Sequence, residues 1–137
     1  MYIVFGNRVV DSKDIKENLE KNSLFKVIKD MSKGSKREDI VAFNLSISLN
    51  ILNEILMEDY NLDEVEDDEL FNEYITLAEE LATDLEEFIP EDSIFDIRAY
   101  KWDPSDNDIK VVILLAHEEL GKNKLKDVMK RLLTQVE

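Results

Sequence analysis

Residues 94–115 have the sequence IFDIRAYKWDPSDNDIKVVILL, which predicts the class of the fold. Apolar and polar side chains alternate over residues 94–102, as they do in a strand with one buried face. Residues 109–115 are rich in Val and Ile, which favour strands, and the Asp, Pro, Ser and Asn residues before them are typical of a turn. We therefore expect 94–102 and 109–115 to form an antiparallel hairpin.

The N-terminal residues predict a further strand region. Tyr2 to Val10 is mostly apolar and contains Gly6-Asn7, a pair that suits a two-residue hairpin turn because Gly adopts a positive φ without strain. Both an N-terminal hairpin and a single bent strand fit this pattern.

A helix is predicted next, with Ser12 as its N-terminal cap and with Ile15 and Leu19 on one face. Further apolar residues continue at helical spacing, and we expect the helix, either unbroken or divided at Asn22-Ser23, to include them: Leu24, Val27, Ile28 and Met31. Gly34 is expected to end this element in the left-handed conformation.

Residues 40–52 fit two secondary structures. Their apolar and polar side chains alternate as in a strand, but several of the apolar ones also recur at helical spacing. Ser35 and Glu38 have the spacing of a capping box, and residues 51–56 have a clearly helical pattern. We therefore expect a helix through 40–52 that is apolar nearly all round and lies at the centre of the fold.

Two more helices are predicted from apolar residues three and four positions apart. The first covers 68–88, follows an acidic, turn-like connection at Tyr60–Glu69, and is closed by Pro90. The second lies at the C-terminus, and its apolar face consists of Leu125, Val128, Met129, Leu132 and Val136. The whole pattern predicts one α+β domain over residues 1–137, with a small, mostly antiparallel sheet packed against four to five helices.

Charge is distributed very unevenly along the chain. The formal net charge is −15, and residues 38–97 contain twenty carboxylates but no Lys or Arg. Such a charge repels nucleic acids and anionic lipids, so direct binding to either is not expected. The chain has no Cys and no apolar run long enough for a membrane span or a signal sequence, and we expect a soluble, cytoplasmic protein.

The sequence contains no recognisable catalytic motif. Its three glycines are far apart, which excludes the phosphate-binding loops of common nucleotide-binding folds. The single histidine, His117, lies at the predicted start of the last helix and has no Ser or Cys nucleophile in a suitable context. Asp103, Asp106 and Asp108 have the ligand type for a hard cation but lack the spacing of a calcium loop, and they are interpreted as turn residues. Neither an enzyme activity nor a metal or cofactor is expected.

Trp102 and Tyr100, at the end of the predicted hairpin, admit two interpretations. Aromatic side chains are common anchors of protein interfaces. They also commonly cover the edge of a core, and we favour this second role.

The predicted helix 68–88 carries the candidate functional residues. Eight carboxylates occur in 21 residues, or about 31 Å of helix, which gives about one charge per 4 Å. The phosphates of one DNA strand follow one another about every 3.4 Å along the helix axis. A face next to the apolar stripe is predicted to bind a basic partner, through Glu69, Glu73, Glu80, Asp84 and Glu87.

Four interpretations of the protein remain open. The protein could inhibit a DNA- or RNA-binding protein by occupying its nucleic-acid-binding surface, as phage-type anti-defence and DNA-mimic proteins do. It could instead be an immunity protein or antitoxin that neutralises a cationic toxin. A third interpretation is that the acidic face only improves solvation, and that lysines from the two ends of the chain fold back to neutralise it. The fourth is an enzyme whose site the sequence does not reveal.

Overall fold

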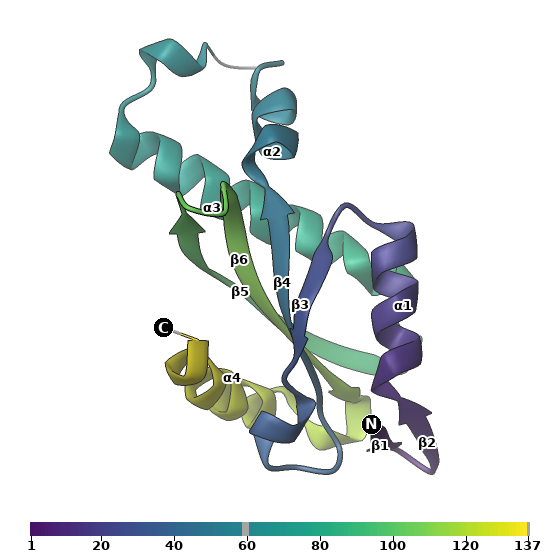
Figure 1. The fold of residues 1–137 in the computed structure, drawn as a ribbon. Coiled ribbons are helices and arrows are strands. Elements are labelled where there is room, and N and C mark those ends of the chain that lie inside the picture. Colours follow the sequence, from purple (N-terminus) through teal and green to yellow (C-terminus); the bar gives the residue numbers. More distant parts are fainter. Residues whose placement is uncertain (59–60, 137) are drawn as a thin grey trace.

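The computed structural model describes residues 1–58 and 61–136, and in this part of the chain four α-helices pack on two antiparallel sheets (Figure 1). The larger sheet is a middle layer. Helices α1 (Ser12–Asn22), α2 (Leu49–Leu56) and α3 (Asp67–Thr83) lie on one side of it, and α4 (Lys122–Val136) lies on the other. The predicted α+β class is confirmed.

The larger sheet has four antiparallel strands in the order β3-β4-β6-β5. They are β3 (Lys26–Asp30), β4 (Val41–Ser48), β5 (Ser93–Asp103) and β6 (Asp108–His117). The predicted hairpin is confirmed as β5–β6, in which Ile97 pairs with Ile113 and Trp102 with Ile109. Strand β6 also pairs with β4 over eight residues, so it is hydrogen-bonded on both edges.

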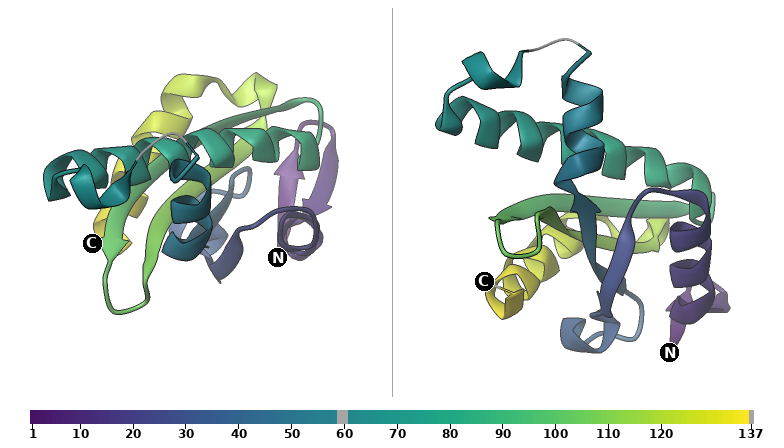
Figure 2. Two further views of the ribbon diagram at one scale, coloured as in Figure 1. Left: turned by 90° about the horizontal axis from the view of Figure 1, so that it is seen from above. Right: turned by 45° about the horizontal axis from the view of Figure 1, so that its top comes forward.

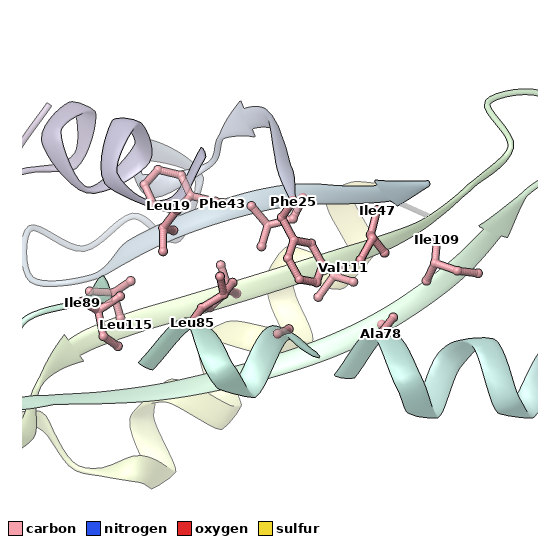
Figure 3. Packing of buried hydrophobic residues seen from close by; sticks show 14 of the residues in the cluster. Leu19, Phe25, Phe43, Ile47, Ala78, Leu85, Ile89, Ile109, Val111 and Leu115 are labelled. Atoms are coloured by element: carbon pink, nitrogen blue, oxygen red, sulfur yellow. The ribbon is translucent and has the colours of Figure 1, made fainter. Parts of the chain in front are cut away.

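The core has two parts because both faces of β4 and β6 are covered. Phe43, Val111 and Leu115 point to the side of α1, α2 and α3, where they meet Leu19 and Leu85 (Figure 3). The other face of the same strands packs against α4, through Ala42, Val112, Leu114 and Ala116. Side chains of a strand alternate between faces, so the unbroken apolar run of β6 supplies both cores.

The N-terminal region is a hairpin, which decides between the two predicted alternatives. Strands β1 (Tyr2–Phe5) and β2 (Arg8–Asp11) are joined by Gly6 and Asn7, and Gly6 has φ +64°. A positive φ at only the first central residue is the pattern of a type II′ turn, in which Gly is strongly preferred. A Cβ atom at Gly6 would also lie 2.7 Å from Cδ2 of His117, so this position needs glycine for two reasons.

The first helix is shorter than predicted. Helix α1 begins at Ser12 and buries Ile15 and Leu19 as expected, but its cap is the Asp11 carboxylate, which accepts a hydrogen bond from the Lys13 N–H at 3.1 Å. The hydroxyl of Ser23 donates to the Leu19 carbonyl and accepts from the Phe25 amide, which turns the chain out of the helix.

The residues after Ser23 form a strand, so the predicted helical continuation through Leu24, Val27, Ile28 and Met31 is wrong. They belong to or flank β3, which has a bulge between Val27 and Lys29. Pairing with β4 outweighed the helical spacing of these four residues, of which Leu24 and Ile28 remain largely exposed.

The helix predicted through 40–52 is also wrong over its first part, where β4 replaces it. The alternation puts Phe43, Leu45 and Ile47 on one face, and on the other face Asn44 accepts a hydrogen bond from the Tyr100 hydroxyl at 3.0 Å. The helical pattern is correct only from Leu49, where α2 begins.

Gly34 and Ser35 do not have the helix-terminal roles predicted for them. Gly34 lies within a 3₁₀ turn (Ser32–Ser35), and the left-handed residue after that turn is Lys36, with φ 59°. A Cβ at Gly34 would lie 2.6 Å from Oε1 of Gln135, so a larger residue there would require this flexible side chain of α4 to move. Ser35 caps no helix, because its hydroxyl is buried and donates to the Ser32 carbonyl at 2.7 Å.

The two remaining helices are found where they were predicted. Helix α3 continues into a 3₁₀ turn (Asp84–Phe88) before Pro90, and α4 buries Leu125, Val128, Met129 and Leu132. The acidic connection contains a short 3₁₀ turn, Leu62–Glu64, while its first residue, Tyr60, lies outside the described residues. No helix in the described ranges combines the length and the apolar character that crossing a bilayer requires.

Replacing Gly6 should destabilise the protein through both the backbone and the contact with His117. We expect Gly6→Ala to lower the free energy of unfolding by at least about 2 kcal/mol, because a left-handed non-glycine residue costs about 1–2 kcal/mol and the new Cβ meets the imidazole ring. Urea denaturation would measure this loss. In a His117→Ala background the same substitution should cost only the backbone strain; an equal cost in both backgrounds would contradict the contact.

Candidate functional site: an acidic face on helix α3

The sequence of α3 favours a helix whose first turn is rich in acid. Glu66 occupies the cap position, and Asp67, Asp68 and Glu69 follow in the first turn. Carboxylates at this end interact favourably with the helix dipole. No basic residue occurs in the last turn, so the opposite end has no such compensation.

The buried side of α3 is shaped for close packing on the sheet. Ala78 and Ala82 are fully buried, and their small side chains let the helix backbone approach β5 and β6. Tyr74 is also buried, and its hydroxyl donates a hydrogen bond to Asn53 of α2. Burial raises the pKa of Tyr74. These contacts fix the rotation of α3 and therefore the direction of its outer side chains.

The five predicted binding residues lie together on the outer part of this helix and of the turn that follows it. Glu69 and Glu80 are exposed and Glu73 is half-buried, while Asp84 and Glu87 are exposed in the 3₁₀ turn. At 100° per residue, Glu69, Glu73 and Glu80 fall within roughly 40° around the helix axis. We call these five residues, Glu69, Glu73, Glu80, Asp84 and Glu87, the acidic stripe.

The acidic stripe forms no ion pair with a Lys or Arg of the described part of the chain. Among the described residues, no Lys or Arg nitrogen lies within 4.0 Å of any of its five carboxylates. The basic residues of α4 are on the opposite side of the sheet, as the right-hand view of Figure 2 shows. The lysines of α4 therefore do not fold back over the stripe, whereas Lys21 of α1 lines a groove together with Glu87.

Two nearby carboxylates cover the outer edge of β5 instead. Glu79 of α3 accepts a hydrogen bond from the Ala99 amide at 3.1 Å, and Asp96 accepts one from the Ile97 amide at 3.0 Å. These amides point away from β6, so the side chains satisfy donors that the sheet leaves open.

Another carboxylate, Asp92, holds the N-terminal hairpin to the sheet. Both terminal nitrogens of Arg8 donate to Asp92, at 2.8 and 3.0 Å. This paired hydrogen bond with the Arg8 guanidinium lowers the pKa of Asp92.

His117 lies beside this pair and ends β6, rather than beginning the last helix as the sequence predicted. Its Nδ1 accepts a hydrogen bond from the Glu119 amide at 3.2 Å, and its Nε2 lies 3.2 Å from Asp92. Both ring nitrogens therefore have partners, and the ring packs edge-on against Phe5. This environment supports a structural role for His117.

The aspartate cluster of the β5–β6 turn is paired with the side chain of Lys110. Carboxylate oxygens of Asp103, Asp106 and Asp108 lie within 4.8 Å of one another. The ammonium group of Lys110 lies 2.7 Å from both Asp106 and Asp108. Asp103 accepts hydrogen bonds from two amides of the turn, in agreement with its interpretation as a turn residue.

The aromatic residues of β5 contact other parts of the protein. Trp102 is half-buried, stacks on Phe71 at a centroid distance of 6.3 Å, and meets Tyr74 edge-on at 5.1 Å. Trp102 thus joins α3 to the sheet and covers the core, as the favoured interpretation predicted.

The structure also brings together residues that the sequence analysis did not connect. Asp14 and Glu17 of α1 line a groove with Glu87, the last residue of the acidic stripe. They are some seventy positions apart in the chain, and no local pattern links them. The acidic surface therefore extends beyond α3.

The ion pair of Asp92 predicts a specific dependence of stability on pH. A carboxylate whose pKa is lowered by folding stabilises the protein above its ordinary value of 3.8 and loses this effect as the pH falls through the folded value. We expect Asp92→Asn to be less stable than wild type at pH 7 and equal to it well below pH 3.8. Thermal unfolding across this range would measure the difference. The neighbouring exposed acid gives a control, because Glu91→Gln removes no ion pair and should leave the profile unchanged.

Comparison with family models, curated proteins and solved structures found no match to this chain. A function for this chain is therefore inferred from its own residues and their geometry.

Proposed function

We propose that this protein is a non-enzymatic binding protein that docks its acidic stripe on a basic partner, and that the partner is a DNA- or RNA-binding protein whose nucleic-acid-binding surface it occupies. The observation that carries the proposal is the set of five carboxylates on the outer side of α3 and its 3₁₀ extension, none with a Lys or Arg within 4.0 Å in the described part of the chain.

The stripe has the length and charge to replace a stretch of nucleic-acid backbone. From Glu69 to Glu87 it extends about 27 Å along the helix axis. A groove that binds nucleic acid presents Lys and Arg to a row of phosphates, and a rigid row of carboxylates can make charge-assisted hydrogen bonds to the same groups. Because α3 is fixed on the sheet by Tyr74, Ala78 and Ala82, binding does not require the row to be ordered first.

The energetics of the stripe also favour a role in binding. Like charges three or four positions apart on a helix destabilise it by about 0.2–0.5 kcal/mol per pair, as for Glu69 with Glu73 and Glu80 with Asp84. The protein bears this cost without compensating lysines on α3. A basic partner would relieve the repulsion, and its field would speed association at low salt.

The other features that could support catalysis are already occupied by structural contacts. Both nitrogens of His117 are engaged, and the aspartate cluster of the β5–β6 turn holds Lys110. The grooves formed by the described residues are open to solvent. These contacts support a binding protein rather than an enzyme.

The test compares two triple charge reversals. In the stripe variant, Glu73, Glu80 and Glu87 are replaced by Lys; in the matched control, the exposed residues Glu118, Glu119 and Asp127 are replaced by Lys. Both variants change the net charge equally, so only the location differs. Wild type, stripe variant and control are immobilised and incubated with a nuclease-treated lysate of the source cells, and the captured basic proteins are identified.

We expect wild type and control to capture the same nucleic-acid-binding protein and the stripe variant to lose it. With that protein purified, calorimetry should show affinity at least about 100-fold weaker for the stripe variant, because repulsion replaces attraction at three positions. Duplex DNA or RNA should compete with wild type for the partner. Equal affinity of the stripe variant, or binding that nucleic acid does not affect, would reject the proposal. The stripe variant should remain folded, with slightly higher stability, since the repulsion is relieved.

A further inference from the structure

A groove beside the N-terminal hairpin adjoins one end of the acidic stripe. It lies between β2, α1 and the segment 87–90, and has a volume of about 800 Å³. Its apolar lining includes Ile15, Phe88 and Ile89, and Glu87 of the stripe stands at its rim. A molecule bound along the stripe would therefore reach this groove without a gap.

One side of the groove is a strand edge with open hydrogen-bonding groups. In the β1–β2 ladder the Ser12 amide donates to the Met1 carbonyl, so with a period of two the ladder bonds fall on the pairs Ile3–Val10 and Phe5–Arg8. Val9 therefore directs its amide and carbonyl away from β1. No partner for either group is found among the described residues, and Val9 is 61% exposed.

The rim of the groove is acidic. Asp14, Glu17 and Glu87 are without a Lys or Arg nitrogen within 4.0 Å in the described ranges, and Lys21 is the one basic side chain that lines the groove. A second copy of this protein is a poor occupant, because pairing through β2 would bring two such rims together. Charge complementarity instead favours a segment that carries Lys or Arg.

We propose that this groove binds an extended, Lys- or Arg-rich peptide segment of the partner, which adds a strand to the outer edge of β2. This inference rests on the proposed function, since it supposes a basic partner, and it adds the form in which part of that partner is bound. The main-chain bonds form with Val9, and the basic side chains reach Asp14, Glu17 and Glu87.

The dimensions of β2 limit the length of the segment. Four residues of strand extend about 13 Å, which suits a core of four or five peptide residues. In an extended peptide alternate side chains point to opposite faces. A segment in which apolar and basic residues alternate can place its apolar side chains over Ile15 and Phe88 while its basic ones stand at the rim.

The probe is a fluorescein-labelled ten-residue peptide of alternating Lys and Val, and its control is the same peptide with Glu in place of Lys. We expect the Lys peptide to bind wild type, with amide chemical shifts changing at Val9 and along α1, and the Glu peptide not to bind. Fluorescence anisotropy gives the affinity. Shift changes confined to α3 would overturn the proposal, because they would show attraction to the stripe alone.

Two substitutions at Val9 separate main-chain bonding from general charge attraction. Val9→Pro removes the outward amide but no bond of the β1–β2 ladder, and proline is tolerated on edge strands. We expect it to weaken binding of the Lys peptide about tenfold, as loss of one well-placed hydrogen bond does. Val9→Ala keeps the amide and should bind within about threefold of wild type. Equal binding by Val9→Pro and Val9→Ala would overturn strand addition.

A charge reversal of the rim tests the groove without depending on how Val9→Pro folds. Asp14→Lys with Glu17→Lys should abolish peptide binding at low salt while leaving capture of the whole partner by the stripe at least partly intact. If the stripe variant keeps the partner and this rim variant loses the peptide, the proposed function fails and the groove inference holds. If the rim variant binds the peptide as wild type does, the groove inference fails and the proposed function is unaffected.

Discussion

Burial of β6 on both faces and pairing on both of its edges are the constraints on which the rest of this structure depends. Its neighbours β4 and β5 provide the hydrogen bonds, and the unbroken apolar run 111–116 supplies side chains to two cores. Each of the two cores is covered by helices on its own side of the sheet, so the acidic α3 and the basic α4 lie on opposite sides. The separation of charge across the molecule, and with it the exposed stripe, follows from this arrangement.

Local sequence patterns predicted the elements whose partners are close in the chain. The β5–β6 hairpin, α3 and α4 were recognisable because each has one clear period and definite turn residues at its ends. For the N-terminal region the sequence left two alternatives, a hairpin and a single bent strand, between which the structure decides. Strands β3 and β4 were missed for physical reasons. The apolar residues of β4 fit both periods, and the choice is made by pairing with β6, some sixty to seventy residues later. The apolar residues around β3 have helical spacing, and the segment becomes a strand by pairing with β4. Ser35 and Glu38 have the spacing of a capping box, but Ser35 is buried in a tight turn and caps no helix.

In the candidate site, too, some features follow from local sequence and others depend on contacts between distant parts of the chain. The acidic stripe could be predicted because its members lie on one helix and the turn that continues it, where spacing alone puts them on a common face. The groove could not, because it combines Val9, Asp14 and Glu87 from three elements that only the tertiary structure brings together. The open edge of β2 depends in addition on the register of a ladder, which composition does not specify.

Two of the outer strand edges, those of β5 and β2, are treated differently, and this has a consequence for the protein's behaviour at high concentration. The eleven-residue edge of β5 is the longest available template for fibre-like association, but Glu79 and Asp96 occupy two of its amides, those of Ala99 and Ile97, with charged groups that an incoming chain would have to displace. The edge of β2 is left open, yet it is short and has negative charges beside it. Crowded copies of this protein are thus hindered from pairing edge to edge through β5 or β2, while a cationic strand meets no such charge barrier at β2.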